Sequence, residues 1–278
     1  MKEDNVIMEK WNYILREEIG EKGKEGRHVF LADRILTDPG KSYGESSQKV
    51  VIKSTDCSSI YLRSTLAELN CLQELQHPGI PRILEHRREG ASYQLVLSYI
   101  EGKSLKIILQ ENKGLEPGEA VSLLRQLGEI LHYLHSQKPP ILYRDLKPEH
   151  IMVDSDGQVH LLDFDGAKPM GKIGERIGNP RFSAPEQFVP QAKVDVRSDI
   201  YAFGRIAELV FKQLPAAALT ESEQRKWKRF FKRCTQETKE KRYRDMKAVL
   251  RELQRLENPK TGMERVREKA DRLGSSLP

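Results

Sequence analysis

The 278-residue chain contains few cysteines and no long hydrophobic run. Cys57, Cys71 and Cys234 lie far apart and in no metal-ligand spacing. We therefore expect reduced thiols, since a disulfide framework would need more cysteines in a shorter chain. No apolar stretch approaches the roughly 20 residues that a membrane-spanning helix requires. The first residues, Met1 to Asn5, are too polar for a secretory signal. These absences favour a cytoplasmic protein without a transmembrane segment.

The net charge of +6 is unevenly distributed along the chain. Residues 221–278 contain 18 Lys and Arg against 10 Asp and Glu, whereas the preceding 220 residues contain 29 against 31. Such a basic region can attract nucleic acid, anionic lipid or an acidic protein. Acidic residues are interspersed throughout it, so we expect a solvated helical surface and no nucleic-acid partner.

Hydrophobic spacing indicates a strand-rich first third. β-branched and aromatic runs predict strands at residues 50–53 and 93–100. Leucines at helical spacing predict a helix over residues 59–76, and His77-Pro78-Gly79 would end it because proline cannot continue a helix. The glycine- and serine-rich residues 38–48 predict a loop between strands.

From about residue 104 the apolar spacing becomes mostly helical. The predicted helices are residues 120–136, 198–212, 221–234 and 245–256, and two short strands are predicted at residues 151–153 and 159–162. A strand-rich part followed by a helix-rich part favours an α+β fold of two lobes with a cleft between them.

Two short segments carry most of the chemical information. Residues 143–150 are Tyr-Arg-Asp-Leu-Lys-Pro-Glu-His, and residues 162–166 are Leu-Asp-Phe-Asp-Gly. Together they resemble the catalytic and metal-binding loops of the protein kinase superfamily, in particular bacterial Ser/Thr kinases. The resemblance covers about residues 15–256. It implies a bilobal, protein kinase-like fold with a β-rich N-lobe at residues 1–98, a mostly helical C-lobe at residues 99–258 and a basic tail at residues 259–278.

The resemblance implies a role for each residue that phosphoryl transfer needs. Lys53 is similar to the strand lysine that holds the α- and β-phosphates of ATP, and Glu68 to its helical partner. Asp145 resembles the catalytic base, and Lys147 the lysine that Ser/Thr kinases direct at the γ-phosphate. Asp163 resembles the carboxylate that binds Mg²⁺.

The same resemblance implies nucleotide-binding positions. The hinge that would bind adenine through its backbone is Ser98-Tyr99-Ile100, directly after Leu97 at the gatekeeper position. The candidates for the glycine-rich loop over the phosphates are Gly20, Gly23, Gly26 and Val29. Their spacing is longer than the family pattern G-x-G-x-x-G-x-V, although glycines still let the backbone approach phosphate closely.

Structural supports match the family as well. Glu186, in Ala184-Pro185-Glu186, resembles the glutamate that closes the activation segment, and Arg242 resembles its arginine partner. Asp199 resembles the buried aspartate that anchors the catalytic loop, and Arg144 the arginine that pairs with an ordered activation segment. Leu72, Tyr143 and Phe164 would stack in the hydrophobic spine between the lobes.

His150 departs from the family pattern, which has Asn as a ligand of a second Mg²⁺ at this position. Imidazole nitrogen is a poorer Mg²⁺ ligand than an amide oxygen and suits transition metals better. Three interpretations stay open: the site works with one metal ion, His150 binds Mn²⁺ through a ring nitrogen, or metal binding and transfer are largely lost.

Asp165 replaces the glycine that follows Asp163-Phe164 in the family. It either compensates for His150 with a further carboxylate or adds negative charge beside ATP. The segment from there to Phe182 contains no Ser, Thr or Tyr, so phosphorylation cannot order it. We expect an activation segment that is ordered by Glu175 pairing with Arg144 or controlled by a partner.

These features predict an ATP-dependent Ser/Thr protein kinase that transfers the γ-phosphate to a protein hydroxyl, with Mg²⁺ as its metal and Mn²⁺ as the alternative. The five retained catalytic residues favour this function. The alternative is a pseudokinase, a nucleotide-binding or scaffolding module that regulates a partner, and the departures at His150, Asp165 and the glycine loop favour it. A small-molecule kinase is the remotest interpretation, since the Ala-Pro-Glu segment and Arg242 are both present. Nothing in the sequence indicates an oligomeric state.

Overall fold

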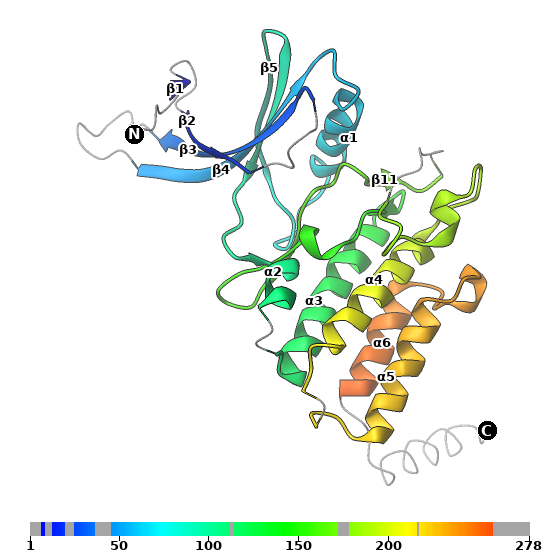
Figure 1. The fold of residues 1–278 in the computed structure, drawn as a ribbon. Coiled ribbons are helices and arrows are strands. Elements are labelled where there is room, and N and C mark those ends of the chain that lie inside the picture. The colour runs from blue at the N-terminus through cyan, green and yellow to red at the C-terminus, as the bar shows by residue number, and fades with distance from the viewer. Residues whose placement is uncertain are drawn as a thin grey trace, which may run out of the picture.

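The computed structural model describes residues 7–8, 13–19, 25–36, 46–111, 114–171, 178–215 and 217–257. The described chain forms an antiparallel sheet that lies above a mostly helical region (Figure 1). This confirms the α+β, two-lobed fold that the sequence predicts. Among the described residues, no helix has the length and apolar character that crossing a membrane requires.

A six-stranded sheet dominates the first part of the chain, with strand order β1-β2-β3-β4-β6-β5 and antiparallel pairing throughout. Its strands are β1 (Ile7–Met8), β2 (Tyr13–Glu18), β3 (Arg27–Leu36), β4 (Ser46–Asp56), β5 (Ile83–Glu89) and β6 (Ser92–Ser98). The predicted loop over residues 38–48 is therefore wrong at its end, because pairing of β4 with β3 begins at Ser46. Strand β6 ends at Ser98, which leaves Tyr99 and Ile100 beyond the ladder.

Helix α1 (Leu62–Leu72) packs beside the sheet and is shorter than predicted. Its last N–H donor is that of Gln73, which bonds to the carbonyl of Leu69. The next bond, from Leu75 N–H to the carbonyl of Leu72, spans only three residues and tightens the chain into a turn. The helix therefore ends before His77-Pro78-Gly79 and is not ended by it.

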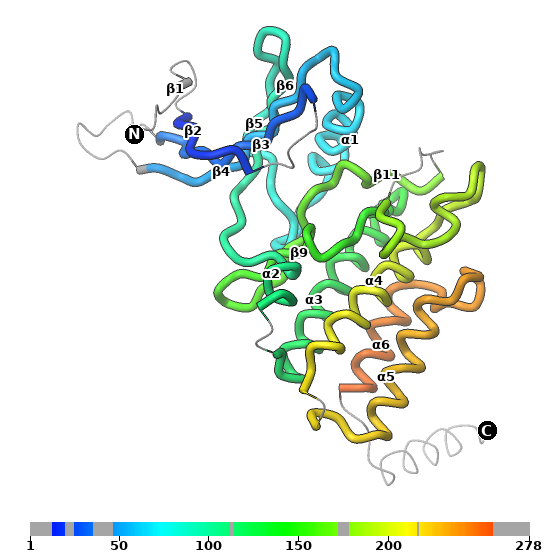
Figure 2. The backbone as a smooth tube through the Cα atoms, viewed as in Figure 1, coloured from blue at the N-terminus to red at the C-terminus, as the bar shows by residue number. Residues whose placement is uncertain are grey.

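The helical region contains α2 (Leu105–Gln110), α3 (Pro117–His135), α4 (Val196–Phe211), α5 (Glu221–Cys234) and α6 (Met246–Glu257), with short 3₁₀ turns η1 (Pro148–His150), η2 (Pro185–Phe188) and η3 (Lys239–Lys241). Small antiparallel sheets join β7 (Lys103–Ser104), β9 (Ile151–Val153) and β10 (Val159–Leu161), and β8 (Ile141–Leu142) with β11 (Lys168–Pro169). Figure 2 shows α3, α4, α5 and α6 packed side by side. Helix α3 begins earlier than predicted because Pro117 suits a first turn and the Glu119 carboxylate accepts the N–H of Glu116.

One hydrophobic core runs through both parts of the molecule. It joins Leu69 and Leu72 of α1 and Leu97 of β6 to buried residues of the helical region such as Leu127 and Phe203. A separate small cluster covers the opposite face of the sheet. Because side chains alternate along a strand, Val50 and Ile52 of β4 enter that small cluster, whereas Lys53 points to the α1 face.

Candidate active site

Lys53 meets two carboxylates from distant parts of the chain. Its Nζ donates to both oxygens of Glu68 on α1, each at 2.7 Å, and to Oδ1 of Asp163 at 2.9 Å. The Lys53 side chain is 8% exposed and that of Glu68 is fully buried. The structure thus brings together the predicted strand lysine, its helical partner and the predicted metal ligand.

Glu68 and the loop that begins at Asp163 are also tied through the backbone. Oε1 of Glu68 accepts the N–H of Phe164 at 3.1 Å. Asp163 has a φ of 59°, in the left-handed region, which costs an L-residue roughly 1–3 kcal/mol and persists only where the surroundings hold it. The hydrogen bonds to Lys53 and from Phe164 to Glu68 provide that restraint.

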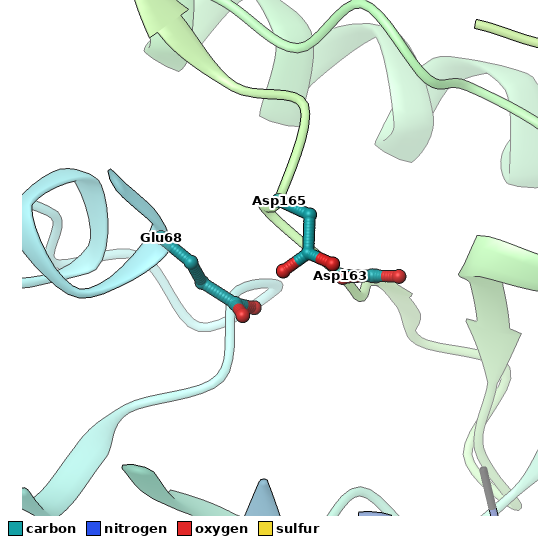
Figure 3. A group of neighbouring side chains, drawn as sticks. All are labelled: Glu68, Asp163 and Asp165. Carbon is teal, nitrogen blue, oxygen red and sulfur yellow. The ribbon is translucent and has the colours of Figure 1, made fainter. Parts of the chain in front are cut away.

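The carboxylate of Asp165 faces Glu68, and Asp163 lies beside them (Figure 3). The three carboxylates are gathered around Lys53, which lies 3.7 Å from Oδ1 of Asp165. Burial raises the pKa of Glu68, whereas Lys53, which donates to both of its oxygens, lowers it. Burial also disfavours charge on Asp163, but the neighbouring Lys53, His150 and Arg27 together outweigh it and hold the pKa of that carboxyl far below its ordinary value. Asp163 therefore stays ionised and available to a cation.

Asp199 holds the catalytic loop from helix α4. Its two carboxylate oxygens accept the backbone N–H groups of Tyr143 and Arg144 at 2.9 and 2.8 Å. The Nε2 of His135, at the end of α3, lies 2.9 Å from the same carboxylate. Arg144 has a φ of 70°, and the bond to Asp199 stabilises this left-handed conformation. Asp145 directly follows this strained residue, so its position depends on a fully buried carboxylate.

Asp145, Lys147 and His150 are neighbours, and His150 links them to Asp163. The Nζ of Lys147 is 3.5 Å from Oδ2 of Asp145, whose side chain is 21% exposed. His150 reaches both carboxylates: its Nδ1 is 3.6 Å from Asp145 Oδ2, and its Nε2 is 3.4 Å from Asp163 Oδ2. The two predicted functional loops therefore converge, and the predicted base Asp145 and the predicted metal ligand Asp163 are both partly exposed.

The protonated nitrogen of His150 follows from its neighbours. Nδ1 lies 3.0 Å from the backbone carbonyl of Asp145, which can only accept a hydrogen bond. It also lies 3.2 Å from the Tyr143 hydroxyl, whose own proton goes to the carbonyl of Leu162. Burial lowers the pKa of His150, which favours the neutral ring. Nδ1 thus carries the proton, and the lone pair of Nε2 faces Asp163.

Glu186 and Arg242 form a bidentate ion pair that ties η2 to the segment before α6. Nη1 of Arg242 lies 2.6 Å from Oε1 of Glu186, and Nη2 lies 2.9 Å from Oε2. Ser198 Oγ also donates to Glu186, at 2.7 Å. Burial would raise the pKa of Glu186, but the hydrogen bonds from Arg242 and Ser198 lower it. This pair was expected from the sequence and connects residues 56 positions apart.

The predicted nucleotide positions are only partly within the described residues. Gly20 and Gly23 lie outside them, as does Glu175, so its predicted pairing with Arg144 stays a prediction. Gly26 has a φ of +73°, and Val29 lies opposite Lys53 in the ladder of β3 and β4. The predicted gatekeeper, Leu97, is buried in the core. The predicted hinge, Ser98, Tyr99 and Ile100, forms the end of β6 and the connection after it.

Three residues at the site were not among the sequence predictions. Arg27 is buried and pairs with Asp165, His135 contacts Asp199, and Gln187 Nε2 donates to the carbonyl of Arg144 at 2.8 Å. The signal for Gln187 was its place directly after Glu186 in a recognised motif. Arg27 follows Gly26 at a position that the family pattern leaves open, so the sequence gives no signal for its role.

Comparisons with known proteins agree with this geometry. The family model for the protein kinase domain matches residues 41–261. Serine/threonine-protein kinase pkn2 of Myxococcus xanthus is 38% identical over 148 residues, which is 49% of this chain and 17% of that protein. The probable serine/threonine-protein kinase PknB of Lactococcus lactis subsp. lactis is 28% identical over 73% of this chain and 32% of its own length. Serine/threonine-protein kinase PrkC of Bacillus subtilis is 27% identical over 68% of this chain and 29% of its own length.

The chain belongs to the protein kinase family, and these three relatives are serine/threonine kinases of the bacterial type. It spans about a third or less of the length of each of them.

Proposed function

We propose that the chain is an ATP-dependent serine/threonine protein kinase domain that transfers the γ-phosphate of ATP to a hydroxyl of a protein. The observation that carries this proposal is that Lys53 bonds to Glu68 and Asp163 within 2.9 Å, close to Asp145, whose Oδ2 lies 3.5 Å from Nζ of Lys147. These are the positioning, metal-binding and proton-accepting groups that phosphoryl transfer requires.

The residues present fit a divalent cation and a nucleotide. Asp163 is ionised, has a side chain that is 27% exposed and faces the bare Nε2 of His150 with its second oxygen. An oxygen and a nitrogen donor together suit Mn²⁺, and the carboxylate alone suits Mg²⁺. When bound, the metal ion would neutralise charge on the phosphates. Lys53 is the cation available to the α- and β-phosphates, and its charge is secure because the three carboxylates outweigh burial and raise its pKa.

Asp145 is the residue that would accept the proton of the acceptor hydroxyl. Its carboxylate is partly exposed, and Lys147 beside it supplies positive charge where the transferred phosphoryl group would pass. A lysine at this position favours Ser or Thr over Tyr as the acceptor, by the resemblance to Ser/Thr kinases.

The test is transfer of radiolabelled phosphate from ATP to the chain itself and to a generic basic protein, with Mg²⁺ and Mn²⁺ supplied separately. We expect Asp145→Asn to lower transfer roughly 10²- to 10⁴-fold, because general base catalysis contributes about that much. The thermal shift caused by ADP and metal should be retained in the variant. Transfer that is absent, or present to the same extent in the variant, would contradict the proposal.

A pseudokinase is the second candidate, and one observation favours it. Asp163 Oδ1 is already bonded to Lys53 and lies 4.0 Å from Nη2 of Arg27, so two cations occupy one side of the predicted metal ligand. A chain that binds nucleotide with either metal and yet transfers no phosphate would establish this function, with a regulated protein as its partner.

A further inference from the structure

Arg27, which is buried, and Asp165, which is partly buried, form an ion pair between the sheet and the predicted metal-binding loop. Arg27 is the first residue of β3, and its side chain is only 5% exposed. Its Nη1 contacts Oδ2 of Asp165, and its Nη2 lies 4.0 Å from Oδ1 of Asp163. The Asp165 side chain is 18% exposed. The two residues are 138 positions apart in the sequence and meet only in the folded chain.

The charges of Arg27 and Asp165 balance each other. Asp165 stands where the family pattern has glycine, and Arg27 directly follows the last candidate glycine, Gly26, at a position that the pattern leaves open. A buried guanidinium without a counterion is costly, and so is a carboxylate added to a site that already holds Glu68 and Asp163. The direct contact removes both costs at once.

The Arg27–Asp165 pair also determines how many carboxylates depend on Lys53 as their counterion. Lys53 Nζ lies 2.7 Å from Glu68, 2.9 Å from Asp163 and 3.7 Å from Asp165. Without Arg27, three carboxylates would surround this single ammonium group. Without Asp165, Arg27 would keep Asp163 as its nearest carboxylate and would compete there with Lys53 and with any metal ion.

We propose that Arg27 and Asp165 are a matched pair of positioning residues that holds Lys53 and Asp163 in their nucleotide-binding arrangement. The pair links the sheet to the loop at residues 163–165, so it also couples the two lobes. The activity part of this inference rests on the proposed kinase function, whereas the coupling itself does not.

The sharpest test restores the family's glycine. We expect Asp165→Gly to weaken the site, raising the KM for ATP by about tenfold while kcat changes less, because Arg27 then engages Asp163. Arg27→Ala should weaken it too. The double variant Arg27→Ala, Asp165→Gly should recover most of the loss, since Lys53 is left with Glu68 and Asp163 alone.

A second measurement does not depend on activity. Breaking the pair should lower the thermal unfolding midpoint by roughly 5–10 °C in each single variant, and the double variant should lie well above the additive expectation. The midpoint shift produced by ADP with Mg²⁺ should follow the same pattern. Arg225→Ala is the matched control, because Arg225 forms an exposed ion pair with Glu221 on α5, with side chains that are 67% and 88% exposed, and its midpoint should barely move.

Additive midpoints, or an Asp165→Gly variant that binds ADP and ATP more tightly than the parent, would overturn the proposal. If the parent chain transfers no phosphate, the kinase proposal fails. The unfolding cycle and the ADP shift still decide whether Arg27 and Asp165 are coupled.

Discussion

His150 offers a nitrogen donor at a site whose other candidate ligands are carboxylate oxygens. Its Nε2 lone pair lies 3.4 Å from Oδ2 of Asp163. Nitrogen ligands favour Mn²⁺ over Mg²⁺ relative to an amide oxygen. We therefore expect His150→Asn to lower the ratio of the Mn²⁺-supported to the Mg²⁺-supported transfer rate, on the order of tenfold. The measurement is transfer rate against the concentration of each metal at saturating ATP.

His160→Asn is the matched control, because the His160 side chain is 13% exposed, close to the 10% of His150, and its Nε2 lies 2.8 Å from the carboxylate of Asp154, away from the site. It should leave the metal ratio unchanged. If His150→Asn lowers the rates with both metals equally, His150 acts only by positioning Asp145 and Asp163, and its role as a metal ligand is wrong.

Arg242 has a fully buried side chain whose charge is balanced by Glu186. Removing one member of such a pair leaves the other charge buried and uncompensated. We expect Arg242→Ala to lower the free energy of unfolding by about 3–5 kcal/mol in urea denaturation. Arg244→Ala, two residues on, removes an exposed arginine paired with its neighbour Asp245 and should cost less than about 0.5 kcal/mol. Equal losses in the two variants would contradict this account.

Helix α4 depends on an ionised cap at its start. The Asp195 side chain accepts the N–H of Arg197 at 2.9 Å, and Nη2 of Arg197 lies 2.7 Å from it. Burial would raise the pKa of Asp195, but the hydrogen bonds from Arg197, together with the nearby Lys239, lower it from 3.8 to about 2. A depressed pKa stabilises the fold above the ordinary value, and this stabilisation is lost as pH falls from about 3.8 through about 2.

Asp195→Asn tests this cap because an amide can still cap a helix but does not titrate. We expect the variant to be about 1 kcal/mol less stable than the parent near neutral pH. The difference should shrink in urea unfolding at the acid end of that window. A difference that is constant with pH would show that the carboxylate charge of Asp195 does not stabilise α4.

Most elements could be predicted from periodicity, but their ends could not. Helix α5 is an exception, since its observed bounds are the predicted ones; in the structure Thr220 caps its start, accepting the N–H of Glu223 through its hydroxyl. The end of α1 was missed because leucine spacing continues to Leu75, whereas the backbone has already tightened after Leu72. Apolar spacing reports which face is buried, and it persists through a turn that still packs against the core.

The motifs located the centre of the site, because Asp145 and Asp163 belong to short patterns whose spacing is local. They could not reveal what faces Asp165, since Arg27 reaches it only after the sheet has closed over the loop. The sequence shows that His150 departs from the family pattern, but it does not show the tautomer of this side chain. The tautomer depends on the carbonyl of Asp145 and the hydroxyl of Tyr143. Long-range partners of charged groups are set by the fold and not by a local pattern.

The continuous core predicts that the whole molecule unfolds as one unit. Leu72 of α1 is 4% exposed and belongs to the same hydrophobic cluster as Trp227 of α5. We expect Leu72→Ala to lower the free energy of unfolding by about 2–5 kcal/mol, since it leaves a cavity in a buried core. Tryptophan fluorescence of Trp227, in a Trp11→Phe background, and far-UV circular dichroism should still report coincident transitions.

Ile60→Ala, at a side chain that is 84% exposed, is the control and should change stability by less than about 0.5 kcal/mol. If the fluorescence transition stays at its original midpoint while part of the dichroism signal is lost earlier, then the sheet and the helical region unfold separately, and the core that joins them does not couple the lobes.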